Sequence, residues 1–184
     1  MHKLATIFLK PCFLWSWTHQ SRAVDPREGG IGSPSAMSDY PSTTFLDGTL
    51  HDENVIVVGA SAPWADTTLA TSFSNFGKKT VDVFAPGEKV TSINAGAEFN
   101  TADGTSFSAP IVTGIAALIL EYYPKLSAAQ IKQAIMQSAT PLTGFMVNKP
   151  GTHQKVDFTT LCKSGGIVNA RKALEIASEM KGER

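Results

Sequence analysis

The chain has 184 residues, and its 16 lysines and arginines balance 16 aspartates and glutamates, so the formal net charge at pH 7 is zero. No basic run or face accompanies this balance, which argues against a nucleic-acid partner. The two cysteines, Cys12 and Cys162, are too few for a disulfide framework and too far apart for a structural zinc site, so one long-range or intermolecular disulfide is what remains open.

Residues 1–42 differ in character from the rest. A short apolar stretch around Trp15 and Trp17 precedes a segment rich in glycine, proline and serine. Lys10 and Pro11 interrupt the apolar run, no clear cleavage site follows, and the run is too short to cross a membrane as a helix. We expect 1–42 to be irregular, either a divergent leader or a segment that never belonged to the domain, and we expect the domain to occupy 43–184.

Residues 55–60, with the sequence VIVVGA, form a continuous β-branched run that ends in small residues. This pattern predicts a strand buried on both faces of a parallel sheet. A second strand is expected within residues 81–87, VDVFAPG, where proline and glycine end the run in a turn.

Residues 104–110 read GTSFSAP and lead into an apolar run from Ile111 to Tyr123 with helical spacing. Ser106 therefore sits at a helix N-terminus, where free N–H groups and the helix dipole favour a developing oxyanion. A helix that is apolar on several sides is expected to be buried. The simpler interpretation of this segment is a turn with a Ser or Thr cap.

The C-terminal part predicts two more helices. Residues 127–130, SAAQ, are typical of a capping box before a helix that carries Ile131 and Ile135 on one face. Asn169 is the expected N-cap of the last helix. Between these helices, residues 143–164 form a polar insertion.

These segments, in this order, resemble the subtilisin-like serine peptidases. The string at 104–110 is similar to the nucleophile motif of that family. The segments 55–60, 72–77 (SFSNFG), 81–87 and 165–174 (GGIVNARKAL) are similar to further family motifs. The resemblance covers roughly residues 54–174. It implies a partial three-layer α/β fold with a mostly parallel sheet and a buried nucleophile helix, truncated at its N-terminal side.

The resemblance also implies Ser106 as the nucleophile, with its own backbone N–H as an oxyanion donor. The family's aspartate and histidine motifs are not found. Asp47 lacks a preceding apolar run and is interpreted as a loop residue. None of the four histidines has the neighbours of the family's histidine motif; they are His2, His19, His51 and His153. The family's oxyanion asparagine is also missing, because Asn54 and Asn75 match other family positions.

We therefore expect a fragment of a serine endopeptidase whose substrates are polypeptides. The alternative is an inactive remnant or an interaction module that needs another chain to complete its fold. By family analogy the protein would be secreted or in the cell envelope. We expect no cofactor. Calcium is suggested only by the same analogy, since the sequence has no carboxylate cluster that would bind it. Without its flanking strands the sheet would have exposed edges, so we expect poor stability unless something covers them. The α/β-hydrolase family is disfavoured because its motif needs a glycine where Ser108 stands.

Overall fold

The computed structural model describes residues 2–10, 13–21, 55–93 and 96–183. Its main sheet has six strands in the order β2-β1-β3-β4-β10-β7. The central strands are β3 (Val55–Ser61), β4 (Val83–Pro86) and β10 (Gly166–Ile167), which run parallel. β7 (Thr140–Pro141) flanks them antiparallel. The expected buried strand at 55–60 is thus confirmed.

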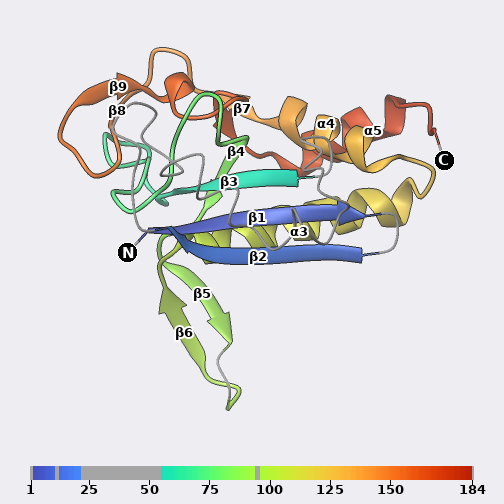
Figure 1. Cartoon of the computed structure of the whole chain (residues 1–184), viewed down its shortest axis with the longest axis horizontal. Helices are drawn as coiled ribbons and strands as arrows, with labels where there is room; N and C mark the ends of the chain where they lie inside the picture. The colour runs from blue at the N-terminus through green and yellow to red at the C-terminus, as the bar shows by residue number, and fades with distance from the viewer. Residues whose placement is uncertain (1, 11–12, 22–54, 94–95, 184) are drawn as a thin grey trace.

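The N-terminal residues form a hairpin where an irregular segment was expected. β1 (His2–Lys10) and β2 (Phe13–Ser21) are antiparallel partners, and β1 also pairs antiparallel with β3. Figure 1 shows this hairpin beside β3. The edge of β3 that the sequence left without a partner is therefore covered by the chain's own first strand.

Three helices follow in the chain: α3 (Thr105–Tyr122), α4 (Ala128–Ser138) and α5 (Ala170–Glu179). The capping box before α4 is confirmed, because the Gln130 N–H donates to Ser127 Oγ and the Ser127 N–H donates to Gln130 Oε1. The N-cap of α5 is confirmed as well: the Asn169 side chain accepts from the Lys172 N–H at 3.0 Å. These local signals define the helix starts because each satisfies N–H groups that the helix itself leaves unpaired.

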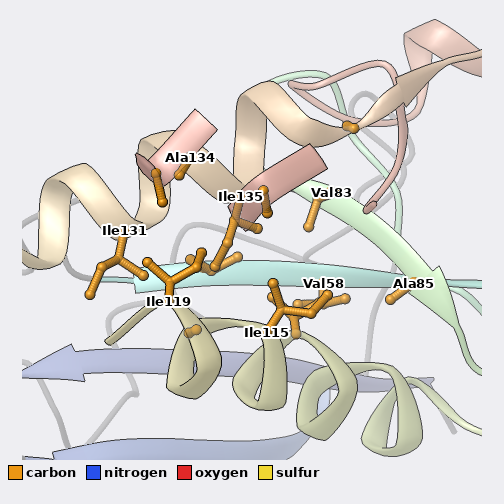
Figure 2. Packing of buried hydrophobic residues seen from close by; sticks show 14 of the residues in the cluster. Val58, Val83, Ala85, Ile115, Ile119, Ile131, Ala134 and Ile135 are labelled. Carbon is orange, nitrogen blue, oxygen red and sulfur yellow. The ribbon is translucent and has the colours of Figure 1, made fainter. Parts of the chain in front are cut away.

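The core has two parts, one on each face of β3 and β4. Successive strand residues point to opposite faces, so Ile56 and Val58 pack against the helices while Val55 and Val57 face the other way. Figure 2 shows Ile115 and Ile119 of α3, Ile131 and Ile135 of α4 and Val58 of β3 in one apolar cluster between the helices and the sheet.

The second part of the core lies under the polar insertion. Phe84 of β4 packs edge-on against Phe158, with ring centroids 5.0 Å apart. The insertion contains β8 (Met146–Asn148), β9 (Lys155–Asp157) and a short 3-10 helix (Phe158–Thr160). Helices, sheet and insertion thus form three layers, in agreement with the expected fold class.

One element projects from this body. β5 (Val90–Ile93) and β6 (Phe99–Ala102) form an antiparallel ribbon between β4 and α3 (Figure 1). Ile93 and Phe99 face each other across it and are 64% and 77% exposed. The ribbon therefore carries apolar side chains that nothing in the described part of the chain covers.

Candidate active site

The candidate site lies at the carboxyl ends of β3 and β4. Because the two strands are parallel, Ser61 and Pro86 lie opposite each other at the same edge of the sheet. The next residue, Gly87, donates its N–H to the Ser61 carbonyl at 3.0 Å. Gly87 is thereby fixed just beyond the sheet, where α3 begins.

Gly104 joins this edge to the helix. Its N–H donates to the Gly87 carbonyl at 2.7 Å, and its own carbonyl accepts from the Phe107 N–H at 3.0 Å. The φ angle of Gly104 is 154°, and side chains rarely tolerate this conformation. A glycine here lets the chain turn sharply into α3 two residues before Ser106.

Close packing sets the position of the helix start. A Cβ on Gly87 would lie 2.3 Å from Ser108 Oγ and 2.6 Å from the Cβ of Ala60, so only a glycine fits. Ser108 is fully buried and donates its hydroxyl to the Ala85 carbonyl at 3.1 Å. In the sequence Ser108 stands out only as part of a motif, whereas in the structure it ties the first turn of α3 to β4.

Ser106 itself lies in the first turn of α3 and is half-buried. No side chain caps this N-terminus. The first N–H groups of a helix lack intrahelical partners, and the Ser106 N–H belongs to this set. Among the described residues, Ser106 Oγ makes no hydrogen bond. Its surroundings therefore combine partial access from solvent with the positive end of a helix dipole.

The side chains that the structure describes, those of 55–93 and 96–183, give Ser106 no histidine partner. His153 is exposed in the insertion, between β8 and β9. His2 and His19 lie on β1 and β2. His51, like Asp47 and Asn54, lies outside the described residues.

Asn75, the other asparagine considered, is buried in the second part of the core at 1% exposure. The backbone carbonyl oxygen of Asn75 accepts a hydrogen bond from the Ser74 hydroxyl at 2.7 Å. The Ser74 hydroxyl oxygen in turn accepts one from the N–H of Ala60 on β3. This links Asn75 to the sheet through Ser74.

A buried carboxylate, Asp82, was not singled out from the sequence. Its Oδ2 accepts from the Val57 N–H at 2.8 Å and lies 3.7 Å from Lys132 Nζ, while its Oδ1 lies 2.9 Å from Lys163 Nζ. Asp82 precedes β4, at the opposite end of that strand from Gly87 and Ser106. Its role is to join β3, α4 and the insertion. The signal in the sequence was a lone acidic residue inside an apolar run.

No metal cluster is found in the part of the chain that the structure describes: no three of its histidine, cysteine, aspartate and glutamate side chains gather at one place. Cys162 is a buried free thiol, and burial raises its pKa above the ordinary value. Its sulfur contacts the Ser164 hydroxyl at 3.6 Å and the Gly166 carbonyl at 3.7 Å. Cys162 forms no disulfide in this structure. Cys12 lies outside the described residues, and an intermolecular disulfide stays a prediction.

By length and composition alone, α3 is apolar enough to cross a membrane, as core helices of soluble proteins also are. Thirty-nine per cent of it is buried in this structure, on the face that packs against β3 and β4. Its apolar character is therefore explained on that face by the sheet.

Known proteins resemble parts of this chain in sequence and in fold. The subtilase family model matches residues 15–158. The extracellular serine proteinase of Thermus sp. (strain Rt41A) is 42% identical over 88 residues, which are 47% of this chain and 20% of that protein. Subtilisin DY of Bacillus licheniformis is 40% identical over 91 residues, 49% of this chain and 31% of that protein. The chain thus spans about a fifth to a third of the length of these relatives.

Solved structures of other proteins have a fold similar to part of this chain. A structure of the subtilase cytotoxin SubAB assembly matches with a TM-score of 0.51 at 25% identity, covering 66% of this chain and 36% of that one. The prenylagaramide maturation protease PagA matches with a TM-score of 0.50 at 27% identity, covering 65% and 41%. The family match extends over most of the chain and includes the strand, turn and helix that carry Ser106, and the chain therefore belongs to the subtilase family.

Proposed function

We propose that this chain provides the nucleophilic serine of a serine endopeptidase, and that Ser106 is that residue. The observation that carries the proposal is the position of Ser106: in the first turn of α3, directly after the Gly104 turn that is anchored on Gly87. This position combines a half-buried hydroxyl with a helix N-terminus that has no side-chain cap.

The proposed reaction is hydrolysis of a peptide bond. Ser106 Oγ attacks the scissile carbonyl, and the new C–O bond leaves an oxyanion on the former carbonyl oxygen. The Ser106 N–H and the positive end of α3 stabilise that charge. As the intermediate collapses, the C–N bond breaks and the proton taken from Ser106 passes to the leaving nitrogen, which departs as the amine. The acyl ester left on Ser106 is then hydrolysed by water.

A serine hydroxyl is a weak nucleophile until a base takes its proton. The side chains described for 55–93 and 96–183 place no base at Ser106, so we propose that the base and its aspartate partner come from other residues of this chain or from a second chain that completes the fold. The substrate class is polypeptide, and an extracellular location is proposed from relatives that bear that name.

Reaction with a fluorophosphonate tests the proposal, because this reagent forms a stable ester with activated serines. Intact mass and peptide mapping would be measured for the whole chain, for Ser106→Ala, and for Ser92→Ala as a control on an exposed serine of β5. We expect an adduct on Ser106 that Ser106→Ala loses and Ser92→Ala keeps. An adduct that persists in Ser106→Ala, or a folded chain that gives no adduct even when imidazole is added as a soluble base, would contradict the proposal and favour the inactive remnant.

A further inference from the structure

A cavity of about 300 Å³ lies between residues 76–79 and the insertion, on the face of the sheet that α3 does not cover. Most of its lining residues are of two kinds, apolar side chains and lysines: Phe76, Val156, Leu161, Lys78, Lys79 and Lys149. Among the described residues, no aspartate or glutamate lines it. We call this cavity the lysine pocket.

Lys149 is the lysine that has hydrogen-bond donors to spare. Its ammonium lies over the ring of Phe76, 5.4 Å from the ring centroid, and makes no ion pair or hydrogen bond with another described residue. The side chain is half-buried, so the ammonium has already lost part of its water. The quadrupole of the ring attracts the charge and leaves N–H groups of the ammonium available to an anion.

A tight turn holds the backbone of Lys149. Its N–H donates to the Gln154 carbonyl at 2.8 Å, and its carbonyl accepts from the N–H and the hydroxyl of Thr152 at 2.9 Å and 3.0 Å. The N–H of the preceding residue, Asn148, donates to the Thr67 carbonyl at 2.7 Å and ties the turn to the loop after β3. The turn fixes the base of the lysine side chain and the Phe76 ring holds its end, so a ligand meets a partly ordered cation.

Backbone carbonyls hold a second charge beside the pocket. Lys78 Nζ lies 2.9 Å from the Thr159 oxygen, 3.2 Å from the Cys162 oxygen and 3.3 Å from the Lys163 oxygen. These bonds occupy the three N–H donors of the ammonium, so Lys78 offers a ligand its charge and no further hydrogen bond. The carbonyls are neutral, and Lys78 makes no ion pair within the described part of the chain. Its positive charge therefore adds to the field in the pocket.

We propose that the lysine pocket binds a carboxylate that carries a short apolar group. The carboxylate lies at the Lys149 ammonium, within the field of Lys78, and the apolar group lies against Val156 and Leu161. A cavity of about 300 Å³ is at the small end of ligand sites, which suits a group the size of one apolar side chain. This inference does not depend on the catalytic role of Ser106, which belongs to α3.

Two simpler kinds of ligand fit this lining less well. An inorganic anion would bury no apolar area, so the apolar side chains of the pocket would contribute nothing to its binding. A neutral apolar molecule would displace water from the Lys149 ammonium and give it no partner, and a charge that is desolvated without a partner costs free energy. The lining therefore favours a molecule that has both a negative charge and an apolar group.

Saturation-transfer-difference NMR with the full chain tests the proposal, with phenylacetate as the ligand. Phenylethanol has the same ring without the charge, and acetate has the charge without the ring. We expect phenylacetate to bind at least about tenfold more tightly than either. Lys149→Met should weaken its binding about five- to tenfold. Lys172→Met, which makes the same charge change on the exposed face of α5, should leave it unaltered.

A free organic acid and the C-terminus of a polypeptide share this chemistry, and a second pair of ligands distinguishes them. N-acetylphenylalanine resembles a polypeptide that ends in an apolar residue, and its amide lacks the carboxylate. Binding of N-acetylphenylalanine but not of its amide would assign the pocket to C-termini. Binding of phenylacetate alone would assign it to free acids, since the acetylated backbone then does not fit.

Equal binding of phenylacetate and phenylethanol would overturn the proposal, as would the absence of phenylacetate binding or an unchanged affinity in Lys149→Met. If Lys149→Met does not fold, nuclear Overhauser effects in the unaltered chain decide. We expect contacts between the ring protons of phenylacetate and the methyl groups of Val156 and Leu161. Contacts with other methyl groups only would show that the carboxylate binds elsewhere.

Discussion

At the scale of single residues, the position of Ser106 depends on neighbours that have no reactive group. Gly87, Gly104 and Ser108 determine where α3 begins, through three backbone hydrogen bonds and one buried hydroxyl. The reactive group is the Ser106 hydroxyl, and the close packing of α3 against β4 sets its position. Substitutions at these supporting positions therefore separate placement from chemistry.

Gly87→Ala should destabilise the chain and slow the reaction of Ser106. The added Cβ would lie 2.3 Å from Ser108 Oγ and would push the first turn of α3 away from β4. We expect the free energy of unfolding to fall by about 1–3 kcal/mol, as for other overpacked sites. Chemical denaturation and the rate of fluorophosphonate labelling measure the two effects.

Gly114→Ala is the matched control. Gly114 is exposed on α3, and a Cβ there would have no atom within 4 Å. We expect this variant to gain about 0.5–1 kcal/mol of stability and to label at the unaltered rate. Equal effects of the two alanines would show that packing at Gly87 does not position the helix.

Asp82→Asn should be strongly destabilising, although Asp82 is remote from Ser106. It leaves Lys163 and Lys132 without their carboxylate at the junction of three elements. We expect a loss of about 2–4 kcal/mol, because removing one partner of a buried ion pair leaves the other uncompensated. Glu175→Gln, which breaks the exposed pair with Arg171, is expected to cost less than about 0.5 kcal/mol in the same denaturation experiment.

At the scale of elements, the insertion is held by its own local contacts. Hydrogen bonds to Asp157 from the Thr159 hydroxyl and N–H, and then from the Gly144 N–H, lower the pKa of this carboxyl. A carboxyl with a lowered pKa in the folded state stabilises that state above its unfolded pKa of about 3.9, and the effect is lost as the pH falls through the lowered value. The turns at Gly144 and Thr159 should therefore loosen in acid.

This acid sensitivity is measured by NMR, from the amide signals of Gly144 and Thr159 between about pH 6 and about pH 2. We expect a titration in the unaltered chain and none of it in Asp157→Asn, because asparagine keeps an acceptor oxygen but has no charge to lose. A titration of the same size in Asp157→Asn would assign the effect to another group.

The elements also show what the sequence could and could not predict. The strand at 55–60, the capping box at Ser127 and the cap at Asn169 were predictable because each depends on residues close together in the chain. The pairing of β1 with β3 and the contacts of Asp82 were not, because the partners lie 25 or more residues away and only folding brings them together. Within the site, the Ser106 position was readable from its motif, whereas the tie between Ser108 and β4 was not.

At the scale of the whole molecule, the chain carries part of the subtilase fold and spans about a fifth to a third of the length of the relatives it matches. β1 pairs with β3 and covers an edge that the sequence left open, which removes one reason for the expected poor stability. Other surfaces stay uncovered by the described residues: Leu118 and Tyr122 on α3 are 45% and 68% exposed. The all-round burial expected of α3 is therefore only partly realised, on the face toward the sheet.

The central claim is that α3 presents Ser106 as the nucleophile of a serine endopeptidase. It is tested most directly by the rate of fluorophosphonate labelling with added imidazole, a soluble substitute for the histidine side chain. Circular dichroism would establish that the chain is folded. We predict that labelling of Ser106 accelerates in proportion to neutral imidazole and is absent in Ser106→Ala. A folded chain in which Ser106 stays unlabelled at every imidazole concentration would contradict the claim.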